Sequence, residues 1–232
     1  MFSLQNGAVK LFRLWGLTVS VHWSWLLVAI WEIQSRRGGY SSIAFTILEY
    51  LALFLLVLLH EFGHSLATRS VGGIADRIVL WPLGGVAFVQ PPERAGATLW
   101  CIAAGPLVNL ALLPLLGGLT ALAGIAHAGD DLQHFVSRVF LIDLVMMVFN
   151  LLPIYPLDGG KILHALLWPF FGRARSLRVA TIIGIIGAAC VLLLAILSGD
   201  MWLVYLAAFG GLSAWRGFKQ AGILLEREES QR

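Results

Sequence analysis

Residues 42–64 read SIAFTILEYLALFLLVLLHEFGH, an apolar run that ends in two histidines and a glutamate. About 20 apolar residues are enough for a helix to cross a bilayer, so this run predicts a transmembrane helix. A charged side chain at bilayer depth costs about 2.5–3.5 kcal/mol on insertion scales. The alternative is a polar cap where the helix leaves the membrane, but three such residues in five positions favour a chemical role.

The motif His60-Glu61-Phe62-Gly63-His64 has the spacing of a zinc site. Histidines four residues apart share one helix face, so both can reach a single zinc ion. The intervening glutamate can take a proton from the water that the metal activates. Catalytic zinc has three protein ligands and one open position for water. A third ligand must therefore come from elsewhere in the chain.

Asp158 is the best candidate for that third ligand. It stands in the stretch Asn150-Leu-Leu-Pro153-Ile-Tyr-Pro156-Leu-Asp158-Gly-Gly, whose prolines break a helix and whose glycines allow close backbone approach. Taken alone, this stretch is equally well a surface turn with Asp before Gly-Gly. Because it is predicted on the same side of the membrane as His60 and His64, a ligand role is the stronger interpretation.

The composition predicts a polytopic membrane protein. Of 232 residues, 59% are hydrophobic and 12% are charged, against about 45–50% and 25% in soluble domains. These values exclude a soluble globular domain and a disordered chain, and nothing resembles a nucleic-acid-binding module. We predict an all-α fold with about six transmembrane helices, at residues 17–34, 42–64, 95–124, 135–152, 177–198 and 201–218.

The distribution of basic residues predicts the orientation in the membrane. With the N-terminus in the cytoplasm, thirteen of the sixteen Lys and Arg residues fall on the cytoplasmic side, and only Arg36, Arg37 and Arg138 fall outside. Cytoplasmic loops of membrane proteins are enriched in these residues. Both termini are therefore expected in the cytoplasm, with a short charged tail at 219–232.

Residues 78–89 lack a helical pattern. Two short apolar runs flank Pro82-Leu83-Gly84-Gly85, which predicts a short membrane-associated β-hairpin between the second and third helices. The edge of such a hairpin could pair with an unwound substrate segment as an added strand.

Together these motifs resemble the site-2 protease family of intramembrane zinc metalloproteases. The resemblance rests on His60-Glu-Phe-Gly-His64 followed by Asn150-x-x-Pro-x-x-x-x-Asp158-Gly. Gly105-Pro-Leu-Val-Asn109 is similar to the family's Gly-Pro-x-x-Asn element. Pro82-Leu-Gly-Gly85 is similar to its membrane-associated β-hairpin, and residues 16–24 to the segment that leads into its first helix.

The resemblance also implies a domain organisation. It covers about residues 14–170, the expected catalytic core, and residues 177–218 would add two further transmembrane helices. The whole of 1–232 is then a single intramembrane metalloprotease domain. Many relatives carry a PDZ or a CBS module, whereas this chain is expected to be the compact form without either.

The resemblance implies the following site and substrate. His60, His64 and Asp158 would bind one zinc ion per chain, and Glu61 would be the catalytic acid and base. The enzyme would cut the transmembrane segment of a membrane-tethered regulator or a leftover signal peptide, in a prokaryotic cell membrane. Asn150 is expected to donate to a developing oxyanion or to hold the substrate backbone. Its alternative role is an interhelical hydrogen bond.

Other polar residues have weaker expectations, and the alternatives stay open. Asn109 is expected to clamp two helices near the site. Glu49 and Asp143 either line a polar interior or gate, or lie at the interface or pair with each other. Packing roles are favoured for His22 and His164. The alternative function is a zinc-binding membrane carrier or scaffold without protease activity, against which Glu61 argues, because a carrier needs no base between its ligands. The substrate's identity and the oligomeric state stay open.

Overall fold

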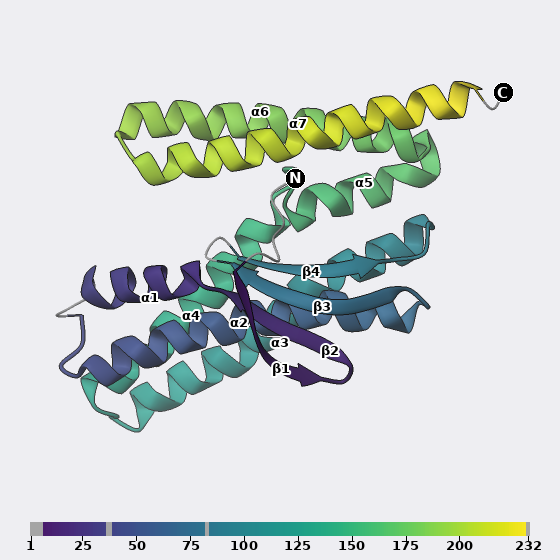
Figure 1. Cartoon of the computed structure of the whole chain (residues 1–232). Helices are drawn as coiled ribbons and strands as arrows, with labels where there is room; N and C mark the ends of the chain where they lie inside the picture. The colour runs from purple at the N-terminus through teal and green to yellow at the C-terminus, as the bar shows by residue number, and fades with distance from the viewer. Residues whose placement is uncertain (1–6, 36–38, 82–83, 231–232) are drawn as a thin grey trace. The chain divides into compact units, whose positions relative to one another are not determined.

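The computed structural model describes residues 7–35, 39–81 and 84–230, and it is mostly helical with one small β-sheet (Figure 1). In chain order the elements are β1 (Ala8–Leu14), β2 (Leu17–His22), α1 (Ser24–Ser35), α2 (Ile43–Ser70), β3 (Ile74–Trp81), β4 (Gly84–Gln90), α3 (Ala95–Ile125), α4 (Asp130–Leu151), α5 (Asp158–Phe171), α6 (Arg173–Ser198) and α7 (Met201–Ser230).

Four helices in the described ranges are long and apolar enough to cross a membrane, namely α2, α3, α4 and α6. Helix α2 has 28 residues and extends for about 42 Å, which exceeds a hydrocarbon core of about 30 Å. These four helices contain or largely overlap the second to fifth expected spans. The sixth expected span, 201–218, lies inside α7. A total of six spans stays a prediction.

The expected first span at 17–34 was wrong in its first half. Leu17–His22 form strand β2, and helix α1 begins only at Ser24. The twelve residues of α1 extend for about 18 Å, less than the hydrocarbon core. A high average hydropathy concealed the two-residue alternation at the start of β2, in which Leu17 and Val19 are fully buried and Thr18 and Ser20 are half-buried.

The sheet has four strands in the order β1-β2-β3-β4, so β1 and β4 are its edges. Strands β1 and β2 are antiparallel, and Trp15 and Gly16 form the two-residue turn between them. Both turn residues have positive φ (48° and 78°), as the tight turns that suit the twist of a hairpin require. Strand β3 pairs in parallel with β2, after the crossover through α1 and α2.

The expected hairpin at 78–89 is part of this larger sheet. Strands β3 and β4 pair antiparallel from Ile74 opposite Gln90 to Trp81 opposite Gly84. Of the predicted turn, Pro82 and Leu83 lie outside the described residues, as do Arg36 and Arg37 of the predicted outer loop. Strands β1 and β2 were not predicted, and the residues of β2 were assigned to the first span at 17–34.

Helix α2 packs against the sheet through one apolar face. Four residues of the sheet are fully buried, namely Leu17, Val19, Ile78 and Leu80. They share a core with five further residues, namely Trp25 of α1, Val57, Leu58 and Phe62 of α2, and Ala75 of β3. This core fixes the rotation of α2 about its axis, and therefore the direction in which its histidines point.

The chain divides into two compact units, each of which is described by itself. The first comprises Met1–Pro92 and Ala104–Met147, and the second comprises Glu93–Ala103 and Val148–Arg232. In the second unit α6 and α7 lie side by side (Figure 1). Small residues allow this close packing, since a Cβ added to Gly184 would lie 3.1 Å from Cβ of Ala214.

Candidate metal centre

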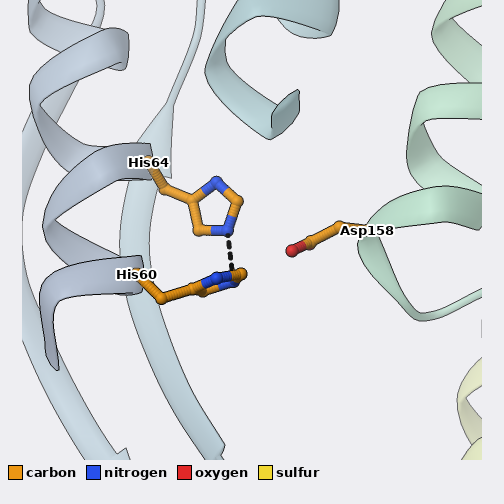
Figure 2. A group of neighbouring side chains, drawn as sticks. All are labelled: His60, His64 and Asp158. Atoms are coloured by element: carbon orange, nitrogen blue, oxygen red, sulfur yellow. Dashed lines mark hydrogen bonds between the residues drawn. The ribbon is translucent and has the colours of Figure 1, made fainter. Parts of the chain in front are cut away.

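His60 and His64 project from successive turns of α2 in the first unit. Their Nε2 atoms lie 3.1 Å apart, and their exposed fractions are 4% and 9%. Figure 2 shows the two rings with these nitrogens turned toward each other. A tetrahedral zinc ion at about 2.0–2.1 Å from each nitrogen would hold them roughly 3.3 Å apart. The pair therefore fits a shared zinc ion with little adjustment.

Helix α3 approaches this pair with bare backbone at Gly105. A Cβ added there would lie 2.8 Å from Nε2 of His60 and closer still to Nε2 of His64. Gly63 of α2 also allows the two helices to approach closely, since a Cβ added there would lie 2.6 Å from the carbonyl oxygen of Ala104 in α3. The two glycines thus let α2 and α3 come together beside the histidine nitrogens.

The other ring nitrogen of His60 is held by Asn109 of α3. Nδ1 of His60 lies 2.6 Å from Oδ1 of Asn109, and Nδ2 of Asn109 donates to Oδ1 of Asp143 in α4 at 2.5 Å. Both Asn109 and Asp143 are fully buried. The expected helix clamp at Asn109 is therefore present, and it joins three helices rather than two. Glu49, the other buried acid, accepts a hydrogen bond from Tyr40.

The side chain of Glu61 extends from α2 to the edge strand β4. It is 7% exposed, and its Oε2 accepts a 2.9 Å hydrogen bond from the backbone N–H of Ala87. A Cβ added to Gly85 would lie 2.7 Å from Oε1 of Glu61. Sequence reasoning missed both contacts. The Gly84-Gly85 pair was the available signal, and it was interpreted only as a turn.

Asp158 belongs to the second unit, where it begins α5. It is 6% exposed, and its Oδ1 lies 3.3 Å from Nζ of Lys161. The glycines that follow it allow the helix to start against the preceding loop. A Cβ added to Gly159 would lie within 2.5 Å of the Leu151 carbonyl carbon, and one added to Gly160 would also meet the loop backbone. A carboxylate in the first turn is favoured by the helix dipole.

The predicted site residues are thus divided between the units. His60, Glu61, His64 and Asn109 come together in the first unit. Asn150, which is half-buried in the last turn of α4, and Asp158, drawn on α5 in Figure 2, belong to the second. By donor chemistry, two imidazole nitrogens and one carboxylate oxygen form a set that zinc accepts.

The two other histidines considered as candidates have local partners. Nδ1 of His22 lies 2.5 Å from the hydroxyl oxygen of Ser24, and its ring stacks on Trp81. In α5, Nδ1 of His164 lies 2.9 Å from the hydroxyl oxygen of Ser176. Burial, and then the positive charge of Arg173, lower the pKa of His164 below its ordinary value. These contacts are compatible with the expected packing roles, which stay a prediction.

Comparison with known proteins gives a consistent set of similarities. The sequence pattern described as peptidase family M50 matches residues 113–194, which include Asn150 and Asp158 but not the histidine pair. The chain is 32% identical to zinc metalloprotease MJ0392 of Methanocaldococcus jannaschii over 205 residues, which are 88% of this chain and 59% of that protein. It is 30% identical to the protein Rip3 of Mycobacterium tuberculosis over 229 residues, covering 88% of this chain and 57% of that one.

Among solved structures, the fold is similar to that of the site-2 protease from Methanocaldococcus jannaschii. The TM-score is 0.64 at 28% sequence identity, and the match covers 91% of this chain and 95% of that one. The chain spans less than three fifths of the length of the two curated relatives named above.

Proposed function

Since the chain belongs to the site-2 protease family, peptidase family M50, we propose that it is an intramembrane zinc endopeptidase. One observation carries this proposal: a buried His-Glu-x-x-His motif on one helix, in which Nε2 of His60 and Nε2 of His64 face each other and the next residue after His60 is the buried acid Glu61. A structural role would not require two imidazoles and a carboxylate in so apolar a helix.

We assign the zinc ion to His60, His64 and Asp158, with one ion per chain. The histidine geometry, the glycine approach at Gly105 and the carboxylate at the start of α5 support this set. When bound, zinc supplies Lewis acidity. It would polarise the scissile carbonyl and lower the pKa of water, so that the water can lose a proton near neutral pH and act as the nucleophile.

Glu61 is the proton carrier in this proposal. One carboxylate oxygen, Oε2, is held by the N–H of Ala87, which orients the carboxylate. Oε1 then takes the proton of the attacking water and returns it to the leaving amine. Asn150 serves as a donor to the developing oxyanion or to the substrate backbone.

Strand β4 supports a role for the sheet in substrate binding. It is an edge strand, and its Ala87 N–H points to Glu61 rather than to β3. Because N–H groups alternate in direction along a strand, those of Gly85 and Val89 lie on the same outer edge. An unwound substrate segment added along this edge would pass next to Glu61.

The family and the charge distribution support a proposal for the substrate and the topology. We propose a membrane-tethered substrate, a regulator or a leftover signal peptide, in a multi-pass protein with about six spans and both termini in the cytoplasm. The chain is proposed to be one protease domain, with its core at about 14–170.

The test compares three forms of the purified protein in detergent: the wild type, Glu61→Gln and Glu49→Gln. The last makes the same change at another buried acid of α2 and serves as a matched control. Each form is measured for zinc content and offered a panel of single-span substrates. We expect about one zinc per chain in all three and cleavage by the wild type and the control only. Equal cleavage by Glu61→Gln would contradict the mechanism, and zinc without any cleavage would favour the carrier or scaffold.

Proline substitution tests the edge-strand proposal. Val89→Pro removes an outward N–H and is expected to slow cleavage while zinc content and thermal unfolding stay at wild-type values. Unchanged cleavage by this folded variant would exclude pairing of the substrate with β4.

A further inference from the structure

Three buried polar side chains form a hydrogen-bonded series across three helices of the first unit. His60 of α2 meets Asn109 of α3 at 2.6 Å, and Asn109 meets Asp143 of α4 at 2.5 Å. Asn109 and Asp143 have no exposed surface, and α2, α3 and α4 are all long, apolar helices. None of the chemistry proposed above uses Asn109 or Asp143, so their presence at this depth needs a separate reason.

The donor and acceptor types give the series a direction. A carboxylate only accepts, so the amide nitrogen of Asn109 must face Asp143. The amide oxygen of Asn109 then faces His60, where it can only accept, so Nδ1 of His60 must carry the proton. In neutral imidazole one nitrogen is protonated and the other has the lone pair. This order leaves the lone pair of His60 on Nε2, the atom that faces His64.

We infer that Asn109 and Asp143 are positioning residues that hold His60 in the Nδ1–H tautomer, with Nε2 prepared for zinc. Histidines that bind metals donate their other N–H to a partner that fixes the ring and its tautomer. Here Asn109 is that partner, and Asp143 acts only through Asn109, by preventing its amide from turning over. This inference rests on the proposed zinc site.

A purely structural role for Asp143 explains less of what is observed. Its second oxygen, Oδ2, is buried with no hydrogen-bond partner among the described residues. An asparagine would join α3 to α4 without introducing a carboxylate at this depth. What a carboxylate adds is an unambiguous acceptor, which an amide with both donor and acceptor ends cannot supply.

An exchange of the two side chains separates these possibilities. Asp143→Asn leaves two amides that can pair in either direction, and Asn109→Asp places two carboxylates against each other. The double variant Asn109→Asp/Asp143→Asn restores the order, because the new carboxylate accepts from His60 and the new amide donates to that carboxylate. Glu49→Gln, which neutralises a buried acid of α2 that bonds Tyr40, is the control.

Two measurements on detergent-solubilised full-length protein provide the readout. Zinc affinity is measured by competition with a chelator. The tautomer of His60 in metal-free protein is measured from the ¹⁵N shifts of labelled histidine, assigned by comparison with His60→Gln. We expect each single exchange to weaken zinc binding at least 10-fold and Asp143→Asn to populate both tautomers. The double variant should bind zinc within about threefold of the wild type, a strong positive coupling.

The inference would be overturned by additive losses in the double variant, or by an Asp143→Asn protein with wild-type zinc affinity and a single tautomer. Thermal unfolding of all forms identifies variants that lose zinc only because they unfold. If one of the single variants fails to fold, the zinc affinity of the double variant still tests the inference. Failure of the proposed function would look different: the wild type itself would bind no zinc, whereas the tautomer measurement needs no metal.

Discussion

The backbone N–H of Ala87 in the edge strand β4 donates a 2.9 Å hydrogen bond to Oε2 of Glu61 in helix α2. The carboxylate of this residue, which stands between His60 and His64 in the sequence, is thus oriented by a strand that begins more than twenty residues later in the chain. This contact joins the proposed proton carrier to the proposed substrate-binding edge. It also explains why β4 has glycine at position 85, beside the Glu61 side chain.

Gly85→Ala is expected to displace Glu61 and to slow cleavage at least 10-fold, because the new Cβ would lie 2.7 Å from Oε1 of Glu61 and closer to its Cγ. Zinc content should not change, since Glu61 is not a ligand in the proposed site. The control is Gly96→Ala in the first turn of α3, where no atom lies within 4 Å of the added Cβ. Cleavage at the wild-type rate by Gly85→Ala would show that displacement of Glu61 does not reduce activity, which would contradict this prediction.

Gly105→Ala is expected to reduce zinc affinity at least 10-fold, because its methyl group would collide with the Nε2 atoms of both His60 and His64. Gly118→Ala, in the same helix with open space around the added Cβ, should bind zinc as the wild type does. Chelator competition measures both affinities. Equal affinities would mean that the backbone of α3 does not approach the metal.

Asp158→Ala is expected to lower zinc occupancy and to abolish cleavage, because it removes the only proposed oxygen ligand from the protein. Lys161→Ala removes the nearby ammonium group, 3.3 Å from Oδ1 of Asp158, and should leave zinc bound. Metal content after dialysis against a weak chelator provides the comparison. Retention of a full equivalent of zinc by Asp158→Ala would remove this residue from the ligand set.

Treatment of the wild type with a strong chelator is expected to abolish cleavage, and added Zn²⁺ should restore it. The apo protein should also unfold at a lower temperature, since a ligand that binds only the folded state stabilises it. Both effects are measured on one preparation. Full activity in protein shown by elemental analysis to be zinc-free would contradict a zinc mechanism.

Acidification is expected to weaken the second unit through His164. Burial and the charge of Arg173 lower the pKa of His164 from its ordinary value of 6.5, so the fold favours neutral imidazole. The stability that this contributes is present above pH 6.5 and is lost as the pH falls from there toward the lowered pKa. Thermal unfolding at pH 7.5 and 5.5 should show a smaller difference for His164→Gln than for the wild type. His127→Gln, at an exposed position, should behave as the wild type.

The sequence predicted the long apolar helices and the reactive groups of the site, because these signals are local, but it did not predict α5. The apolar run before His60 and the four-residue spacing to His64 depend only on helix geometry, so both could be identified without a structure. The same is true of α6. Strand β2 was assigned to a helix. Its six residues alternate between buried and half-buried only at the start of the strand, and the high average hydropathy of the apolar run beside them hides so short a pattern.

What the sequence determined by itself is therefore the set of reactive groups: a helix that carries His60, Glu61 and His64 through an apolar region, and an aspartate after a proline-broken segment. The tertiary structure alone decided how these groups are held. Ala87 lies 26 residues from Glu61, Asn109 lies 49 residues from His60, and Asp143 lies 34 residues from Asn109. No periodicity relates such positions, because the contacts exist only after α2 has packed on the sheet and α3 and α4 have closed around it.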